Sequence, residues 1–222
     1  MKRFVASFVY FFDRVLPGPR VGGRGSAEAY SRWEYETGKE VLGTYARHFA
    51  SLEGKRVLDV GCGLGGKTLA YLEAGARVVG IDIEAANVAQ ASRFTKGRGA
   101  RAEFAVGDAS RLPFRDGAFD LVVANDSLEH FADPAAALAD IARVLAPGGS
   151  AVLFFTPWKS PLGSHLYDYI HTPWCHLVYP EWLLEELLER STAARGATEP
   201  ESEAKRLMRE YRSELNRITA AR

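Results

Sequence analysis

The sequence predicts an α/β fold built on a parallel sheet with helices on both faces. Three observations lead to this prediction. Short apolar segments rich in β-branched residues alternate with amphipathic segments of helical spacing, a glycine-rich turn follows the first apolar segment, and polar side chains follow several of the others. Apolar strands that alternate with helices are typical of a parallel sheet buried on both faces. Ligands bind such sheets beyond the carboxyl ends of the strands.

The predicted strands number five, and they span 56–60, 77–81, 102–106, 119–124 and 151–155. Helical spacing predicts helices between them at 67–74, 84–95 and 134–145, the last stopped by the Pro-Gly-Gly sequence at 147–149. Further helices are predicted over 26–50, 181–190 and 201–218. We therefore divide the chain into an N-terminal helical cap or extension at 1–50 with a Gly/Pro-rich linker at 17–25, a ligand-binding core at 51–157, and a substrate loop with C-terminal helices at 158–222.

Composition excludes some classes of function. The 222 residues include 28 Lys+Arg and 28 Asp+Glu, so the net charge is zero, which disfavours a large nucleic-acid surface. Cys62 and Cys175 cannot make a disulfide framework, and no spacing predicts a metal site. A reducing cytoplasm is the expected location.

The N-terminal segment 1–16 is amphipathic. One helical face carries five large apolar side chains, namely Phe4, Phe8, Phe11, Phe12 and Val15. Three interpretations stay open: a helix packed on the domain or over the active site, a helix lying on a membrane surface, and a signal peptide. The sequence that follows, Leu16-Pro17-Gly18-Pro19, is a poor cleavage site and disfavours the last of these.

The glycine-rich turn is the strongest functional signal. The spacing of Gly61, Gly63 and Gly66 fits both dinucleotide binders and S-adenosylmethionine binders. Asp59 favours the second class, because a carboxylate repels a pyrophosphate but attracts the ammonium and sulfonium of S-adenosylmethionine. Here the sequence resembles the class I S-adenosylmethionine-dependent methyltransferases, whose first motif has an acidic residue two positions before the first glycine.

The resemblance covers residues 54–156 and includes the segments 112–120 and 143–149 in the family's order. It implies a Rossmann-like class I methyltransferase fold, with S-adenosyl-L-methionine as cofactor and S-adenosyl-L-homocysteine as product. Family members usually close the sheet with two further strands, one of them antiparallel. No segment after Phe155 predicts a strand, so we expect the C-terminal strand hairpin to be absent. Either the chain is truncated at Arg222, which we favour, or its sheet lacks the usual edge hairpin.

Cofactor contacts are predicted at the ends of four strands. The resemblance places the first turn beside the methionine moiety, with contacts from Asp59, Gly61, Cys62, Gly63 and Gly65. Asp82 ends the second strand about 20 residues beyond the first glycine and is expected to accept ribose hydroxyls, with Ile83 beside it. The resemblance implies that Asp108 accepts from the adenine amino group and that Ala109 supplies backbone contact. A plain turn aspartate is the alternative for Asp108. Asn125 opens the segment expected beside the transferred methyl group.

Catalytic and substrate contacts are predicted less directly. His130 is the best-placed candidate for a general base, with a structural histidine as the alternative. His165 and His171 lie in the segment after the fifth strand and are further catalytic candidates. Tyr169 and Trp174 in the same segment form either an apolar substrate wall or packing under a long loop. Tyr30 and Trp33 are candidates for a cap or for substrate contact, with core packing as the alternative.

The sequence therefore predicts methyl transfer to a small-molecule acceptor, with oxygen favoured and nitrogen or carbon open as the acceptor atom. The aromatic loop and apolar N-terminus are compatible with an apolar or lipid-linked acceptor and with peripheral membrane contact through residues 1–16. The oligomeric state is left open. Two alternatives are an NAD-dependent oxidoreductase, which Asp59 disfavours, and a cofactor-binding protein without catalytic activity.

Overall fold

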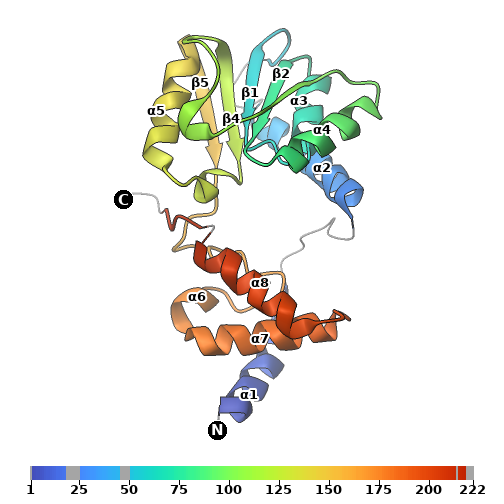
Figure 1. Ribbon diagram of the computed structural model, residues 1–222, viewed down its shortest axis with the longest axis vertical. Coiled ribbons are helices and arrows are strands. Elements are labelled where there is room, and N and C mark those ends of the chain that lie inside the picture. Colours follow the sequence, from blue (N-terminus) through green and yellow to red (C-terminus); the bar gives the residue numbers. More distant parts are fainter. Residues whose placement is uncertain (1, 19–25, 46–50, 214, 219–222) are drawn as a thin grey trace. The chain divides into compact units, whose positions relative to one another are not determined.

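The computed structural model describes residues 2–18, 26–45, 51–213 and 215–218. The chain forms two compact units, one made of Met1–Val21 with Thr156–Arg222 and the other of Gly22–Phe155 (Figure 1). The predicted N-terminal region 1–50 is thus divided between the two units. Most of the predicted linker, at 19–25, and the end of the predicted helix, at 46–50, lie outside the described residues.

The larger unit contains one five-stranded parallel sheet, as predicted. Its strands are β1 (Arg56–Val60), β2 (Arg77–Asp82), β3 (Glu103–Val106), β4 (Phe119–Asn125) and β5 (Leu145–Phe154), in the order β3-β2-β1-β4-β5. The central strand β1 pairs with β2 on one side and with β4 on the other. The described residues after β5 form helices and loops, with no further strand.

Helices cover both faces of this sheet. Helices α2 (Ala27–Tyr45), α3 (Gly66–Glu73) and α4 (Ala85–Lys96) lie together, apart from α5 (Pro134–Val144) (Figure 1). Alternate strand residues explain this layering, because Leu58 and Val122 pack with α5 while Val57 and Val123 pack with α2 and α3. The Asp133 side chain accepts a hydrogen bond from the N–H of Ala136, the third residue of α5, and so fixes where that helix begins.

The predicted fifth strand is present, but it begins at Leu145 and not at Ala151. Leu145 already pairs with Phe119, whereas the next pair joins Leu121 to Ser150. Residues 146–149 therefore stand opposite the single residue Asp120, which is an irregularity within the β4–β5 pairing. Helix α5 ends at Val144, and the Pro-Gly-Gly sequence lies inside the strand and not between the helix and the strand.

The smaller unit is helical, with α1 (Lys2–Val15), α6 (Cys175–Val178), α7 (Glu181–Ala194) and α8 (Pro200–Ser213). Its core joins α7 to α8 through Leu184, Leu187, Leu188 and Met208, all fully buried. The short helix α6 was not predicted, and α8 ends five residues before the predicted end at 218.

Helix α1 packs on this unit through the face opposite its phenylalanines. Ala6 is buried in the helical core, and the Asp13 carboxylate accepts hydrogen bonds of 2.7 Å from both the N–H and the hydroxyl of Thr172. Phe4 and Phe11, by contrast, are 77% and 67% exposed. A buried acidic anchor therefore orients the helix, and its apolar stripe is left uncovered. In the described part of the chain no helix combines the length and apolarity that crossing a membrane requires.

Candidate functional site

The glycine turn between β1 and α3 closes tightly on the end of β4. Gly61 has a φ of +72°, and a Cβ on this residue would lie 2.5 Å from the Cβ of Ser127. The Ser127 hydroxyl donates to the Val60 carbonyl at 3.0 Å, which holds the β1 and β4 ends together. Gly63 and Gly65 also have positive φ, as the predicted turn requires. The absence of a Cβ at Gly61 therefore allows this close approach of the turn to β4.

Asp59 lies beneath the turn instead of in it. Its carboxylate is 2% exposed and accepts a 2.6 Å hydrogen bond from the hydroxyl of Thr68, in the first turn of α3. Burial raises the pKa of Asp59 to about 6, although the Thr68 hydrogen bond and the Lys67 charge act in the opposite direction. Asp59 therefore contributes negative charge to the turn while it fixes the start of α3.

Asp82 connects the turn to the end of β2. One carboxylate oxygen accepts from the Gly63 N–H at 2.9 Å, and the other accepts from the Glu84 N–H at 2.9 Å and from the Asn87 side chain at 3.1 Å. A carboxylate offers about four acceptor positions, so Asp82 retains capacity for a hydroxyl donor. Ile83 is 65% exposed and adds apolar surface beside it. These are properties that a nucleoside site needs at this strand end.

The end of β3 carries the predicted adenine contact. Asp108 is exposed and accepts a 2.8 Å hydrogen bond from the Ser110 N–H, which caps the short helix η1 (Ala109–Arg111). This bond is the one expected of a turn aspartate. Ala109, the first residue of η1, is buried in the core. The recognition of adenine by these two residues stays a prediction.

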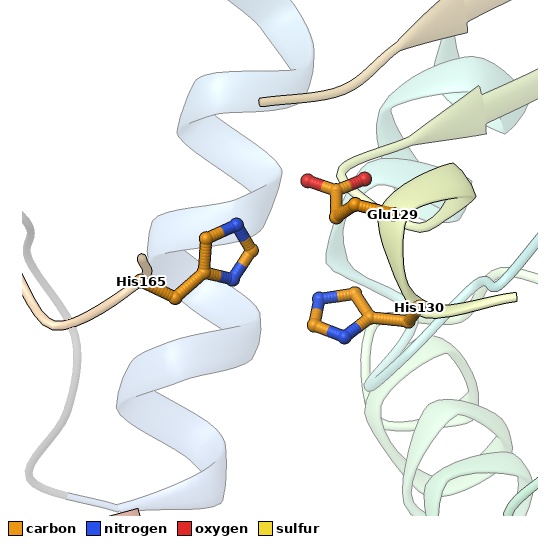
Figure 2. A group of neighbouring side chains, drawn as sticks. All are labelled: Glu129, His130 and His165. Carbon is orange, nitrogen blue, oxygen red and sulfur yellow. The ribbon is translucent and has the colours of Figure 1, made fainter. Parts of the chain in front are cut away.

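The end of β4 provides a polar cluster. Asn125 is buried and donates to the Tyr71 hydroxyl at 2.5 Å, and Asp126 accepts from the Lys67 ammonium at 2.9 Å. The short helix η2 (Leu128–His130) follows, with Glu129 buried and His130 exposed. Figure 2 shows that both of these side chains extend from η2. The role of His130 as a base stays a prediction.

Sequence reasoning missed one carboxyl group at this turn. Glu34 comes from α2, and burial raises its pKa to about 7, with Asp59 raising it further and Lys67 lowering it. Burial also raises the pKa of the Cys62 thiol, and the neighbouring Asp59, Asp82 and Glu34 carboxylates add to that effect. No local pattern marks Glu34, because its position depends on how α2 packs against α3.

The turn is therefore strongly anionic. Among the residues that the structure describes, four carboxyl groups lie around it, from Glu34, Asp59, Asp82 and Asp126, together with the ammonium of Lys67. Such a site repels a pyrophosphate and stabilises a cationic ligand.

The remaining predicted residues belong to two different units. Tyr30 and Trp33 lie half-buried on α2, with ring centroids 5.5 Å apart. His165, His171, Tyr169 and Trp174 all belong to the other unit. Figure 2 includes His165, which adopts a left-handed backbone conformation with a φ of +56°.

Several of the contacts within the helical unit are packing contacts. The Nδ1 atom of His171 lies 3.2 Å from the Leu16 carbonyl, and the Tyr169 ring lies beneath the Arg195 guanidinium at 4.9 Å. Trp174 is 44% exposed, and its indole N–H donates to the Lys159 carbonyl at 3.0 Å. These bonds anchor the segment after β5, and the roles of its residues in catalysis or substrate contact stay predictions.

Comparison with known proteins identifies the core. Residues 58–153 match the family described as "Methyltransferase domain". This part of the chain has the fold of a class I methyltransferase domain. The methyltransferase domain is 43% identical over 105 residues to a demethylmenaquinone methyltransferase of Thermus thermophilus, covering 46% of this chain and 48% of that protein. It is also 37% identical over 118 residues to a ubiquinone biosynthesis O-methyltransferase of Nitrosococcus oceani, covering 53% of this chain and 50% of that protein.

A solved structure shows the same core. A protein from Pyrococcus horikoshii aligns with a TM-score of 0.51 at 34% identity, over 56% of this chain and 59% of that one. This chain thus spans about half the length of the two curated methyltransferases named above.

Proposed function

We propose that this chain is an S-adenosylmethionine-dependent methyltransferase that acts on a small molecule, with oxygen as the favoured acceptor atom. The observation that carries the proposal is the cluster of carboxyl groups around the glycine turn, at the carboxyl ends of β1, β2 and β4. The relatives named as a demethylmenaquinone methyltransferase and a ubiquinone biosynthesis O-methyltransferase support it. The anionic turn disfavours the NAD-dependent alternative.

The residues present fit this cofactor. Asp82 and Ile83 would hold the ribose and one face of the nucleoside, and Asp108 would receive the adenine amino group. When bound, the cofactor supplies a methyl group already activated by a sulfonium, so the protein's main tasks are to orient the acceptor and to exclude water. In this proposal His130 removes the proton of a hydroxyl acceptor, and Tyr30 and Trp33 contact the acceptor.

The test is an assay of S-adenosylhomocysteine formation with a panel of phenol, catechol and amine acceptors. The proposal expects turnover with at least one hydroxyl acceptor, and loss of that turnover in Asp82→Ala. Product formation that is equal in Asp82→Ala and wild type would contradict the proposed cofactor site. Cofactor binding without turnover on any acceptor would favour the non-catalytic alternative.

We propose further that the acceptor is apolar or lipid-linked and that α1 brings the protein to an anionic membrane surface. Phe8 and Phe12 of α1 line an open apolar groove of about 390 Å³ with Tyr179. Lys2 and Arg3 are exposed at the start of the helix, whereas Asp13, its only acidic residue, is buried. An exposed aromatic face with flanking cations and no exposed carboxylate is complementary to anionic lipid. The two cysteines are free thiols, which supports a cytoplasmic location in this proposal.

A further inference from the structure

A buried carboxyl group from α2 reaches the glycine turn. Glu34 is 7% exposed, and its Oε1 atom lies 3.4 Å from the position that a Cβ on Gly63 would take. The Gly66 N–H contributes a hydrogen bond to this carboxyl group. Glu34 is therefore held against the backbone of the turn although it is about 30 residues away in the sequence.

The close approach of α2 depends on a missing side chain. A Cβ on Gly66 would lie 2.2 Å from the Ser31 carbonyl oxygen and 2.5 Å from the Cβ of Glu34. Because Gly66 has no Cβ, the α2 backbone can pack directly on the first turn of α3. This packing places Glu34 at the turn and excludes water from its carboxyl group.

The Oε2 atom of Glu34 is buried and has no hydrogen-bond partner among the residues that the structure describes. The other carboxyl groups at the turn are engaged, since Asp59 accepts from Thr68 and both oxygens of Asp82 accept from backbone N–H groups. The nearest cation, Lys67, is bonded to Asp126 at 2.9 Å. A buried acceptor without a donor is costly, and a ligand that supplies a charged donor removes the cost.

The sheet order indicates which part of the cofactor reaches Glu34. If Asp82 at the end of β2 binds the ribose, a cofactor that crosses to the neighbouring strand has its amino-acid end at the turn after β1. That end carries an ammonium with three donors. Resting on the proposed function, we propose that Glu34 binds the α-ammonium group of the cofactor's methionine moiety and thereby makes recognition of the amino-acid end depend on α2.

Ligands that differ only at this end test the proposal. The probes are S-adenosylhomocysteine, which has the ammonium, and 5′-methylthioadenosine, which lacks the amino-acid end. Binding of each is measured by calorimetry on the full chain, for wild type, for Glu34→Gln, and for the control Glu36→Gln. Glu36 lies on the same helix but pairs with Lys39 on the surface.

We expect Glu34→Gln to lower the affinity for S-adenosylhomocysteine about tenfold or more, because a charge-assisted hydrogen bond is lost. The affinity for methylthioadenosine should stay unchanged. Glu36→Gln should change neither affinity. An equal loss for both ligands would assign Glu34 a structural role only and overturn the proposal. Unchanged binding of S-adenosylhomocysteine to Glu34→Gln would overturn it as well.

Proton release provides a second readout on the wild-type protein alone. With a pKa of about 7, Glu34 is about half protonated at pH 7, so an incoming ammonium should expel about half a proton. Calorimetry in buffers of different ionisation enthalpy measures this number. Proton uptake would mean that a protonated Glu34 donates to the ligand carboxylate, which contradicts the proposal. If wild type binds methylthioadenosine and S-adenosylhomocysteine equally, the inference fails while the proposed cofactor stands, whereas binding of neither overturns both.

Discussion

At the scale of single residues, the site is defined by carboxyl groups that hold the turn through hydrogen bonds and also carry negative charge. Asp82 accepts hydrogen bonds from the N–H groups of Gly63 and Glu84, and Asp59 accepts one from the hydroxyl of Thr68. Each of these groups therefore fixes the turn before any ligand arrives. A preorganised anionic turn needs little rearrangement to bind a cation.

Burial of carboxyl groups should make folding stability depend on pH. The pKa values of Glu34 and Asp59 are raised to about 7 and about 6, so the folded state binds more protons than the unfolded state over this range. Their stabilising contribution is complete below about pH 4 and is lost as the pH rises through about 7. We therefore expect the free energy of unfolding to fall as the pH rises from about 5 to about 7.

Urea unfolding of wild type and Glu34→Gln across this range checks the expectation. The free energy of unfolding of the variant should rise relative to that of wild type as the pH rises, by about 3 kcal/mol at most. Glu36→Gln serves as the surface control and should follow wild type. A constant difference between Glu34→Gln and wild type at all pH values would show that Glu34 is not the titrating group.

His130 provides a prediction about catalysis. As a base it should affect turnover more than cofactor affinity, so His130→Ala should lower kcat by about 100-fold or more with a hydroxyl acceptor. The affinity for S-adenosylhomocysteine should stay close to that of wild type. Steady-state kinetics combined with calorimetry separates the two quantities. Equal losses in turnover and affinity would make His130 a structural residue.

At the scale of elements, the packing of α2 on α3 decides the shape of the site. Gly66 and Gly43 form a matched pair of glycine substitutions. Gly66→Ala would place a Cβ 2.2 Å from the Ser31 carbonyl, whereas a Cβ on Gly43 in α2 meets nothing within 4 Å. We expect Gly66→Ala to destabilise the protein by about 1–3 kcal/mol through overpacking, and Gly43→Ala to stabilise it by about 0.5–1 kcal/mol.

Thermal unfolding of the two variants measures this difference. Gly66→Ala should also lower the affinity for S-adenosylhomocysteine, because Glu34 moves with α2. Gly43→Ala should bind S-adenosylhomocysteine with the affinity of wild type. Equal stability of the two variants would contradict the observed approach of α2 to α3.

Local patterns explain which elements could be predicted from sequence. The strand β1 and the turn after it were predicted because apolar runs and glycine spacing are encoded within a few residues. The start of β5 was missed, because a Pro-Gly-Gly sequence indicates a break while the pairing of Leu145 with Phe119 depends on a distant strand. Glu34 was missed for the same reason, since only the contact between α2 and Gly66 brings it to the turn.

At the scale of the whole molecule, the chain combines a methyltransferase core with a helical unit whose first helix exposes its apolar face. The sequence identified that stripe but left its partner open. The structure shows that Asp13, opposite the stripe, makes the intramolecular contacts. Segments far apart in sequence determine this choice, because the partner Thr172 lies more than 150 residues away.

The exposed face of α1 leads to a prediction about membranes. The chain should sediment with vesicles that contain phosphatidylglycerol and only weakly with neutral phosphatidylcholine vesicles, with binding that decreases as salt rises. The double substitution Phe8→Ser and Phe11→Ser should abolish sedimentation, and Ser7→Ala should not. Binding that is unchanged in the double variant would contradict the proposal. A dimer that this variant disrupts would show that a second copy covers the face.

The most direct test of the account is a calorimetric titration of the chain with S-adenosylmethionine, S-adenosylhomocysteine and NAD in parallel. The anionic turn predicts micromolar binding of the first two and no detectable binding of NAD. Binding of NAD alone, or of none of the three, would contradict the assignment of the carboxyl cluster as a site for a cationic cofactor.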